Sequence, residues 1–391
     1  MTEGFFEQRR EWSRWKHRLL KRYLGQFSAI VGSAHKALYY VDAFAGEGKY
    51  KEPPEEGSPV IAATIAADAA EKKRAFSLQC INIEPKFYDE LCASTAEFSR
   101  SLVENRKGTF ADNLDSVLTT IGKQPALFFL DPFGHKGMEW EVVMRIIGRS
   151  PGAITEVLLN FFITKIDLHA GYLRSKEKQA AKFVARLDAL FGTTEWQALW
   201  GSTDVQEERI LKLTDLYMGR LAKALAAAGT RGITTRYAVR TRKGGLKYFI
   251  IYGTRHPRGA RAMSEAVFKV TADYDDAQAA DAKAEADSAP QPSLFVPEGR
   301  PTPEESDAAI VQGLMPEILA LSATRKRFKL ADLEEALLPS WFGRAIMKHY
   351  RRACICLVEQ GKAQVVGARL ASPGTKRKRI AIGEDAVVEL L

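Results

Sequence analysis

The chain has 391 residues, 46% of them hydrophobic and 27% charged, and a formal net charge of +9. This profile is typical of a soluble globular protein with two or three domains. No apolar run reaches the roughly 20 residues that cross a bilayer, and the N-terminus lacks a signal-peptide layout. Four cysteines are too few and too oddly spaced for a disulfide framework or a zinc site, so we expect a cytoplasmic protein without a metal. The basic charge favours nucleic acid as a partner, with an ordinary solvated surface as the alternative.

The N-terminal segment has the pattern of a helix. Apolar residues recur at three- and four-residue steps from Phe5 to Phe27, between many Arg and Lys residues. The tryptophans of this stretch have the spacing of core residues rather than of a binding platform. We therefore expect residues 1–36 to form a helical flank that packs on the domain that follows.

Residues 37–272 alternate between short β-rich runs and helical stretches. The predicted strands include ALYYVDAF, SLQCINIE, ALFFLDPF and EVLLNFF. Apolar strands that alternate with helices indicate a mostly parallel sheet covered on both faces. A helical insertion is expected over about 165–229, and a hairpin turning at Gly244 and Gly245 comes near the end. We predict an α/β, Rossmann-like fold of the S-adenosylmethionine (SAM) methyltransferase type, which ends in such an antiparallel hairpin.

The composition changes sharply after residue 272. Residues 273–303 are rich in Ala, Asp and Pro and predict a flexible linker. Residues 304–391 contain three predicted helices and then a basic hairpin, KAQVVGARLASPGTKRKRIAIG, which favours a winged-helix-like domain. Between Arg325 and Arg379, fourteen Lys and Arg residues stand against four Asp and Glu residues. This surplus is the electrostatic pattern of a nucleic-acid contact.

Acidic residues stand where the predicted strands end, and ligands of open parallel sheets bind beyond those ends. The first strand runs into a glycine loop whose candidate cofactor contacts are Asp42, Phe44, Gly46 and Gly48. Glycine lets a backbone pass close to a ligand. Glu84 ends the second strand and can accept ribose hydroxyl protons, and Asp112 is expected at a third strand end, near an adenine amino group. The alternative is that these acids cap helices and the glycines form ordinary turns.

Two cofactor classes compete for the glycine loop. A dinucleotide fingerprint continues to a third glycine and straight into a helix whose N-terminus faces a pyrophosphate. Here Lys51 takes the third position, and the next helix start is at Ser58 and Pro59. The intervening insertion carries glutamates that would repel a pyrophosphate, whereas SAM is cationic and has no phosphate. The loop therefore favours SAM over NAD.

These blocks carry a resemblance to a known family. The stretches DAFAGEGKY, GSP, INIEP and FFLDPFG, after the N-terminal FFEQRREWSRWKHRLLKRYL, resemble the three-Cys-motif partner protein family (TcmP) over most of the chain. The resemblance implies a SAM-methyltransferase-type core. It also implies a companion protein whose three-cysteine motif holds an iron–sulfur cluster, as in radical-SAM-like proteins. The insertion before GSP departs from standard methyltransferases, in which the helix begins directly after the glycines.

The stretch FFLDPFG, at the end of the predicted strand that leads to Asp131, resembles motifs of amino-methylating enzymes. It is similar to the fourth motif of the tRNA guanine-N2 dimethyltransferases and to the D/N-P-P-Y/F motif. The resemblance implies that Asp131 orients an exocyclic nitrogen, that the Pro132 carbonyl accepts its second proton, and that Phe133 stacks on the base. The alternative is a strand end capped by proline, with Phe133 in the core.

Basic residues gather around the terminal hairpin and in the last domain, interleaved with Gly, Pro and aromatic residues that suit phosphate contacts. The candidate nucleic-acid contacts are Arg242, Lys243, Lys247, Arg255, Arg258, Arg325, Lys326, Arg327, Lys376, Arg377 and Lys378. In the linker, Gln291 to Phe295 (QPSLF) resembles the pentapeptide by which bacterial proteins dock on the replication sliding clamp. Packing of the linker on its own domain is the alternative.

The sequence leaves two functions of different classes open. The first is a SAM-dependent methyltransferase that acts on an exocyclic amino group of a nucleic-acid base, together with the three-Cys companion. The second is a non-catalytic adaptor that keeps the Rossmann core and delivers nucleic acid to the companion. The glycine loop disfavours a third function, an NAD-dependent oxidoreductase.

Overall fold

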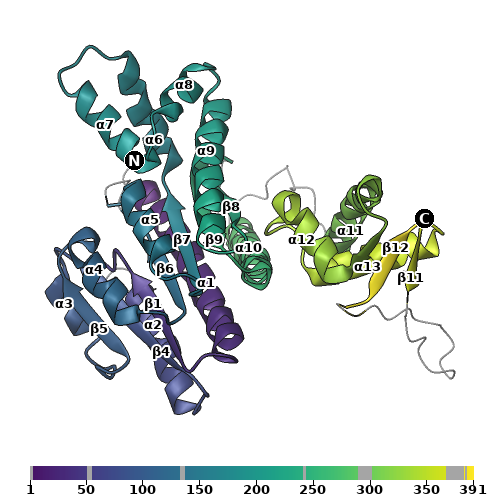
Figure 1. Ribbon diagram of the computed structural model, residues 1–391, viewed down its shortest axis with the longest axis horizontal. Helices are drawn as coiled ribbons and strands as arrows, with labels where there is room; N and C mark the ends of the chain where they lie inside the picture. The colour runs from purple at the N-terminus through teal and green to yellow at the C-terminus, as the bar shows by residue number, and fades with distance from the viewer. Residues whose placement is uncertain are drawn as a thin grey trace. The chain divides into compact units, whose positions relative to one another are not determined.

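The computed structural model describes residues 3–50, 55–132, 137–240, 244–288, 302–366, 383 and 385–391. The chain divides into two compact units, Met1–Ala262 and Met263–Leu391, which are described separately. Figure 1 labels their helices and strands. No described helix combines the length and the apolar character that a membrane span requires.

The first unit is built on a seven-stranded sheet of order β5-β4-β1-β6-β7-β9-β8. The strands from β5 to β7 are parallel, and β9 runs antiparallel to both of its neighbours. This arrangement confirms the predicted Rossmann-like sheet with an antiparallel hairpin. The strands are β1 (Ala37–Asp42), β4 (Ser77–Glu84), β5 (Val103–Lys107), β6 (Ala126–Leu130), β7 (Thr155–Phe161), β8 (Ile233–Arg240) and β9 (Leu246–Thr254).

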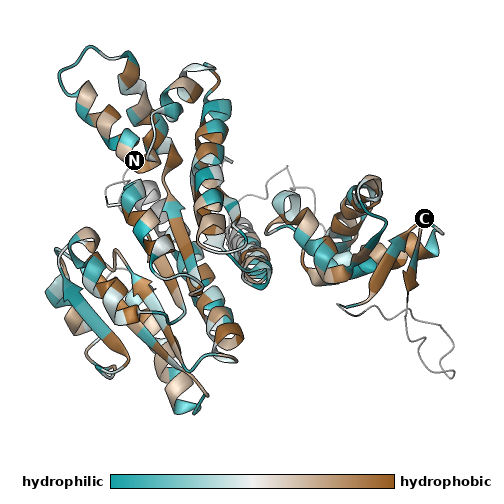
Figure 2. Ribbon diagram, in the orientation of Figure 1, coloured by the Kyte–Doolittle hydropathy of each residue, from teal (hydrophilic) through white to brown (hydrophobic). Residues whose placement is uncertain are grey.

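The central strands form because they are continuous apolar runs. Every residue of β6 and β7 is buried, as expected for parallel strands that are covered on both faces. The edge strand β5 escapes sequence analysis because its residues, VENRK, are mostly polar, and Figure 2 colours it hydrophilic. The third parallel strand therefore ends at Lys107, earlier than the sequence suggested.

Helices cover both faces of the sheet. On one face, α1 and α2 pack against each other and against β1. On the other face, an apolar core joins α4, α5 and α9 to alternate residues of the strands. The bounds of these helices are α1 (Glu3–Gly32), α2 (Ser58–Glu71), α4 (Phe110–Ile121), α5 (Trp140–Gly148) and α9 (Gln206–Ala227). The N-terminal helix thus exceeds its predicted length at both ends.

The segment between β7 and β8 is helical. Before α9 it contains α6 (Ile163–Ala170), the 3-10 helix η1 (Gly171–Arg174), α7 (Ala180–Phe191) and α8 (Glu195–Gly201). Trp196 and Trp200, which share one face of α8, are buried. Their indole N–H groups donate to Asp188 at 2.8 Å and to Asp167 at 2.9 Å, so each buried ring keeps its donor satisfied.

A buried hydrogen-bond network ties α1 to the sheet. The Tyr23 hydroxyl donates to Glu156 Oε2 at 2.5 Å and lies 2.6 Å from the Tyr252 hydroxyl. Thr254 Oγ1 donates to Glu156 Oε1 at 3.2 Å. Burial raises the pKa of Glu156, which is 3% exposed. Donors from α1 and β9 therefore hold a carboxyl group that has little access to water.

Removing the Tyr23 hydroxyl is expected to destabilise the first unit. Tyr23→Phe takes away the closest donor of Glu156, and leaving a buried polar group without its partner costs about 1–3 kcal/mol. Tyr217→Phe is the matched control, because Tyr217 is fully buried and its hydroxyl has no partner among the described residues. Urea unfolding should show a lower midpoint for Tyr23→Phe and an unchanged or higher midpoint for Tyr217→Phe. Equal midpoints would contradict this role of the network.

The second unit begins within α10 (Pro257–Ser288). The linker was expected to start at residue 273, but α10 continues to Ser288, which corrects that boundary. The reason is composition: this stretch contains many alanines, and alanine has the highest helix propensity. Residues 289–301, with the candidate docking peptide Gln291 to Phe295, lie outside the described residues.

Three described helices of the second unit pack with an antiparallel sheet of order β10-β12-β11. In chain order the elements are α11 (Pro303–Ala320), η2 (Leu321–Ala323), β10 (Arg327–Lys329), α12 (Leu330–Trp341), α13 (Met347–Glu359), β11 (Ala363–Val366) and β12 (Val387–Leu390). The basic stretch was expected to return as the second strand of the hairpin. The described partner of β11 is instead Val387–Leu390, at the end of the chain.

Candidate active site

Three of the predicted acids stand at adjacent strand ends. Asp42 ends β1, Glu84 ends β4, and Asp131 follows β6 directly. β1 lies between β4 and β6, and Asp42 is in register with Asn82 on one side and Phe129 on the other. The acids therefore share the carboxyl edge of the sheet, where open parallel sheets bind their ligands.

The glycine loop after β1 is open beside the Cα of Gly46. Gly46 and Gly48 have φ angles of 66° and 80°, a region that glycine enters without a Cβ clash. A Cβ at Gly46 would meet no described heavy atom within 4 Å. The Gly46 N–H donates to Glu84 Oε2 at 2.9 Å, while Glu84 Oε1 accepts from the Lys86 N–H at 2.8 Å and the Phe87 N–H at 3.1 Å. Glu84 thus fixes the loop against the end of β4.

The insertion after the glycines contains a short antiparallel pair, β2 (Lys49–Tyr50) and β3 (Glu55–Glu56). Glu55 lies 3.2 Å from His17 Nδ1, so the insertion rests against α1. The Gly57 N–H donates to the Gly48 carbonyl at 2.7 Å, which returns the chain to the loop before α2 begins. The two ends of the insertion therefore meet next to Gly48, and the glycines stay at the edge of the sheet.

Asp42 supports the loop from inside the protein. It is completely buried, and it accepts hydrogen bonds from the Tyr40 hydroxyl at 3.0 Å and the Phe44 N–H at 3.2 Å. Burial raises the pKa of Asp42 to about 6, although the Ser58 hydroxyl bonds to the carboxylate and opposes this rise. The predicted direct contact between Asp42 and a cofactor is therefore corrected: its carboxylate orients the backbone at Phe44.

The stability of the first unit should depend on pH through Asp42. The folded carboxyl has a pKa of about 6 against an ordinary value of 3.8, so the folded protein holds the proton more tightly than the unfolded chain. Stability should therefore fall as the pH rises from about 4 to about 6 and then level off, by up to about 3 kcal/mol.

The measurement is a series of thermal melts between pH 4 and pH 8. Asp42→Asn should flatten the fall between pH 4 and pH 6 seen in the parent protein. The matched control is Asp115→Asn, because the side chain of Asp115 is 85% exposed, and this variant should keep the parent profile. An Asp42→Asn profile that parallels the parent would rule out the buried carboxyl as the cause.

Side chains from α1 and β7 hold Asp131. Lys16 forms an ion pair with Asp131 Oδ2, and Asn160 Nδ2 donates to Asp131 Oδ1 at 2.6 Å. The side chains of Lys16 and Asp131 are only 12% and 17% exposed. Asn160 Oδ1 is buried and has no hydrogen-bond partner among the described residues. A carboxylate and an unsatisfied amide oxygen thus stand together at the end of β6, followed by the buried Pro132.

The structure describes one of the two remaining predicted site residues, Asp112, at the start of α4. Asp112 forms a capping box with Thr109 at the start of α4, in which the Asp112 N–H donates to Thr109 Oγ1 at 3.3 Å. The Asp112 carboxylate accepts from the Thr109 hydroxyl at 2.5 Å. The expectation that Asp112 ends a strand is therefore wrong, because it caps a helix after β5, while its contact with an adenine amino group stays a prediction. Phe133 lies outside the described residues.

Two of the predicted nucleic-acid contacts bind the protein itself. Arg255 donates to the Ala153 carbonyl at 2.8 Å and to the Ile147 carbonyl, and burial lowers its pKa. Its guanidinium therefore links loops of the first unit, which corrects its assignment to phosphate. Arg327 pairs with Glu389 across β10 and β12 at 2.8 Å, within the second unit.

The remaining predicted contacts fall into two groups. Arg258, Arg325 and Lys326 are exposed, and Lys247 is half-buried. Arg325 also lies over the Phe328 ring, 5.6 Å from its centroid. Outside the described residues lie Arg242, Lys243, Lys376, Arg377 and Lys378.

Two residues of the site, Lys16 and Asn160, do not stand out in the sequence. Lys16 is one of many basic residues in α1, and 115 positions separate it from Asp131, so no local pattern reveals the pair. Asn160 could have been noticed from the sequence, because it is a polar residue inside the apolar run EVLLNFF. A polar side chain in a strand buried on both faces needs a partner.

Comparisons with solved structures give distant likenesses. An O-methyltransferase from Bacillus cereus, solved with SAH, is 14% identical over 60% of this chain and 80% of its own, with a TM-score of 0.31. A Legionella pneumophila protein is 11% identical over 66% of this chain and 92% of its own, with a TM-score of 0.38. The plantazolicin methyltransferase BamL, solved with a substrate analogue and SAH, is 9% identical over 64% and 89%, with a TM-score of 0.29. No family model and no curated protein matches, so the resemblance to the three-Cys-motif partner family stays a prediction.

Proposed function

We propose that the chain is a SAM-dependent methyltransferase that acts on an exocyclic amino group of a nucleic-acid base. The observation that carries the proposal is the carboxyl edge of the sheet. There the open Gly46 backbone and Glu84 share one edge of the sheet with Asp131 and Asn160, and β1 lies between β4 and β6. The first pair suits a nucleoside cofactor, and the second pair suits an amine that donates hydrogen bonds.

The residues of the loop fit SAM. A carboxylate offers about four acceptor sites, and backbone N–H groups of Gly46, Lys86 and Phe87 bond to Glu84. One site is left for a ribose hydroxyl. The acids of this edge favour a cation such as SAM and disfavour a pyrophosphate. SAM would supply a methyl group activated by its positively charged sulfur.

At the target side, Asp131 and Asn160 would orient the amine. An exocyclic amino group has two hydrogens to donate, and Asp131, Asn160 Oδ1 and the Pro132 carbonyl are acceptors. A correctly held amine attacks a methyl group without a strong base, so positioning supplies most of the rate. Phe133 is expected to stack on the base, worth about 1–3 kcal/mol.

The partners belong to the same proposal. Nucleic acid would meet the basic hairpin and the basic last domain, whose described order of helix, strand, two helices and two strands suits a winged-helix-like reader. The three-Cys companion is proposed from the resemblance of the sequence blocks alone.

One observation favours a second function, the non-catalytic adaptor. Lys16 neutralises Asp131, and Asp42 is buried under the loop, so the chain itself engages two of the acids expected to serve ligands. A protein that only binds nucleic acid and the companion would tolerate this arrangement.

Two measurements decide between these functions. Calorimetry tests SAM binding, and label transfer from methyl-labelled SAM to RNA and to DNA tests catalysis, each with and without the companion. Saturable SAM binding together with labelled nucleic acid supports the enzyme. Co-purification with nucleic acid and the companion, without SAM binding, supports the adaptor and overturns the enzyme.

A further inference from the structure

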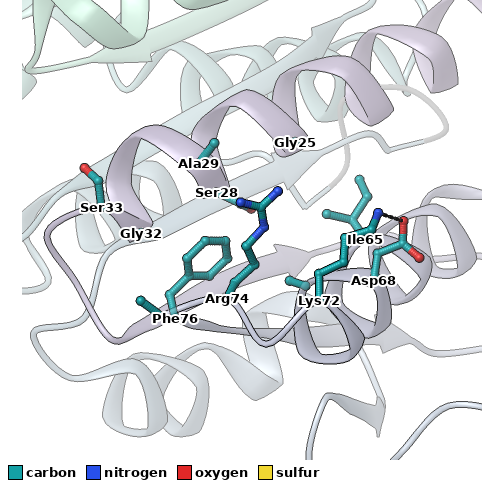
Figure 3. A pocket seen from close by; sticks show the side chains of 12 residues that line it. Gly25, Ser28, Ala29, Gly32, Ser33, Ile65, Asp68, Lys72, Arg74 and Phe76 are labelled. Carbon is teal, nitrogen blue, oxygen red and sulfur yellow. Dashed lines mark hydrogen bonds and ion pairs between the residues drawn. The ribbon is translucent and has the colours of Figure 1, made fainter.

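A groove of about 500 Å³ lies between the C-terminal half of α1 and the end of α2. It sits where α1 leads into β1 and α2 leads into β4, at the edge of the sheet opposite the candidate active site. Its lining is mainly apolar, and its volume falls in the range of small-molecule sites. Figure 3 shows the groove.

The groove exists because α1 carries small residues on this side. A Cβ at Gly25 would meet no described heavy atom within 4 Å, so the helix surface is bare there. At Gly32 a Cβ would come within 2.2 Å of the Phe76 ring, so only glycine lets the two segments approach. Ile65 of α2 lines the groove as well. The result is a cleft with an apolar wall rather than a closed helix–helix contact.

Two polar groups in the groove lack partners. Ser28 is 3% exposed, and its Oγ makes no hydrogen bond among the described residues, not even to the preceding turn of its own helix. Arg74 and Ser28 both line the groove, and Figure 3 shows the Arg74 side chain extending over it. No described carboxylate pairs with Arg74, because Asp68, the acid that lines the groove, pairs with Lys72 at 3.4 Å.

These groups specify the chemistry of a ligand. A buried hydroxyl without a partner is costly, and a bound acceptor would remove that cost. A guanidinium presents a fork of donors that matches a carboxylate. The apolar wall suits a hydrocarbon chain. Arg74 is exposed, so a carboxylate would add a charge pair to a guanidinium that water otherwise hydrates, whereas a neutral or cationic molecule would add none.

We propose that this groove binds a small amphipathic monocarboxylate. Its carboxylate would lie on Arg74 and Ser28, and its hydrocarbon part would lie against Ile65 and Phe76. The proposal is independent of the methyltransferase proposal, because the groove and the candidate active site lie at opposite edges of the sheet.

The test uses octanoate as the probe and the full-length protein. Calorimetry should give saturable one-to-one binding of octanoate and much weaker binding of octan-1-ol and octylamine. Octyl phosphate separates carboxylate recognition from general anion binding, and octanoate should bind more tightly. Failure of octanoate to saturate the protein, or octan-1-ol binding as tightly as octanoate, would overturn the proposal.

Three variants locate the site. Arg74→Gln should weaken octanoate binding at least about tenfold, and Ser28→Ala about fivefold without lowering the melting temperature, because the hydroxyl has no partner to lose. Gly25→Leu should fill the groove and abolish binding while the fold is kept, since leucine is a better helix former than glycine and the space is open. Arg100→Gln, at an exposed arginine elsewhere, is the matched control and should bind as the parent does. Equal affinity in the parent, Arg74→Gln and Gly25→Leu would place octanoate elsewhere and refute the assignment.

Discussion

Asp131→Ala is expected to lower methyl transfer at least about 100-fold, while the affinity for SAM stays within about twofold. The reason lies in the placement of the residue. Asp131 stands at the target side of the sheet edge, where its carboxylate would orient the amine. Among the described residues its hydrogen bonds go to Lys16 and Asn160, whereas Glu84 holds the glycine loop. Loss of orientation acts on the chemical step and leaves cofactor binding in place.

The control must separate this effect from damage to the fold. Asp131→Ala leaves the largely buried Lys16 ammonium without its counter-charge, so the double variant Lys16→Met/Asp131→Ala is needed beside it. Both should lose transfer, and the double variant should melt closer to the parent. Asp115→Ala, on the surface, should keep transfer. Transfer within a few-fold of the parent in a well-folded Asp131→Ala protein would remove Asp131 from the proposed mechanism.

A second large effect is expected from Lys16→Met on stability. Removing one partner from a largely buried ion pair costs about 3–5 kcal/mol, because the other charge is left without compensation. Lys16 and Asp131 keep 12% and 17% exposure, so we expect the low end, about 3 kcal/mol. Chemical unfolding of the parent and the variant measures the difference directly.

A double-mutant cycle assigns this cost to the pair. Lys16→Met/Asp131→Asn should recover most of the lost stability, because no buried charge remains. Lys21→Met replaces an exposed lysine in the same helix and should change stability by less than about 0.5 kcal/mol. If Lys16→Met and Lys21→Met unfold at the same denaturant concentration, the ion pair contributes nothing to the stability of the first unit.

The sheet could be predicted from the sequence because buried strands require continuous apolar runs. Strands such as β6 and β7, covered on both faces, must be apolar throughout, and the hairpin of β8 and β9 turns at glycines. β5 could not be predicted in the same way. An edge strand is covered less, so its side chains are free to be polar, and VENRK reads as a loop.

The candidate site was harder to predict because an acidic residue after a predicted strand can play several structural roles. Asp42, Glu84 and Asp112 were all predicted to end strands, yet Asp42 is buried under the loop, Glu84 holds Gly46, and Asp112 caps α4. The role of each acid depends on contacts with residues that are distant in the sequence. Lys16 is the clearest case, since only the folded protein brings it to Asp131.

The attachment of α1 has a consequence for how the chain folds. Tyr23 meets Tyr252 across 229 positions, and Lys16 meets Asp131 across 115, so the first helix made finds its partners only after most of the first unit exists. Contacts of such long sequence separation slow folding. During synthesis, α1 can meet α2 and β1 early, but Tyr23 must wait for β9, the last strand of the sheet, to emerge from the ribosome. In that interval the incompletely folded first unit exposes apolar surface that a chaperone could bind.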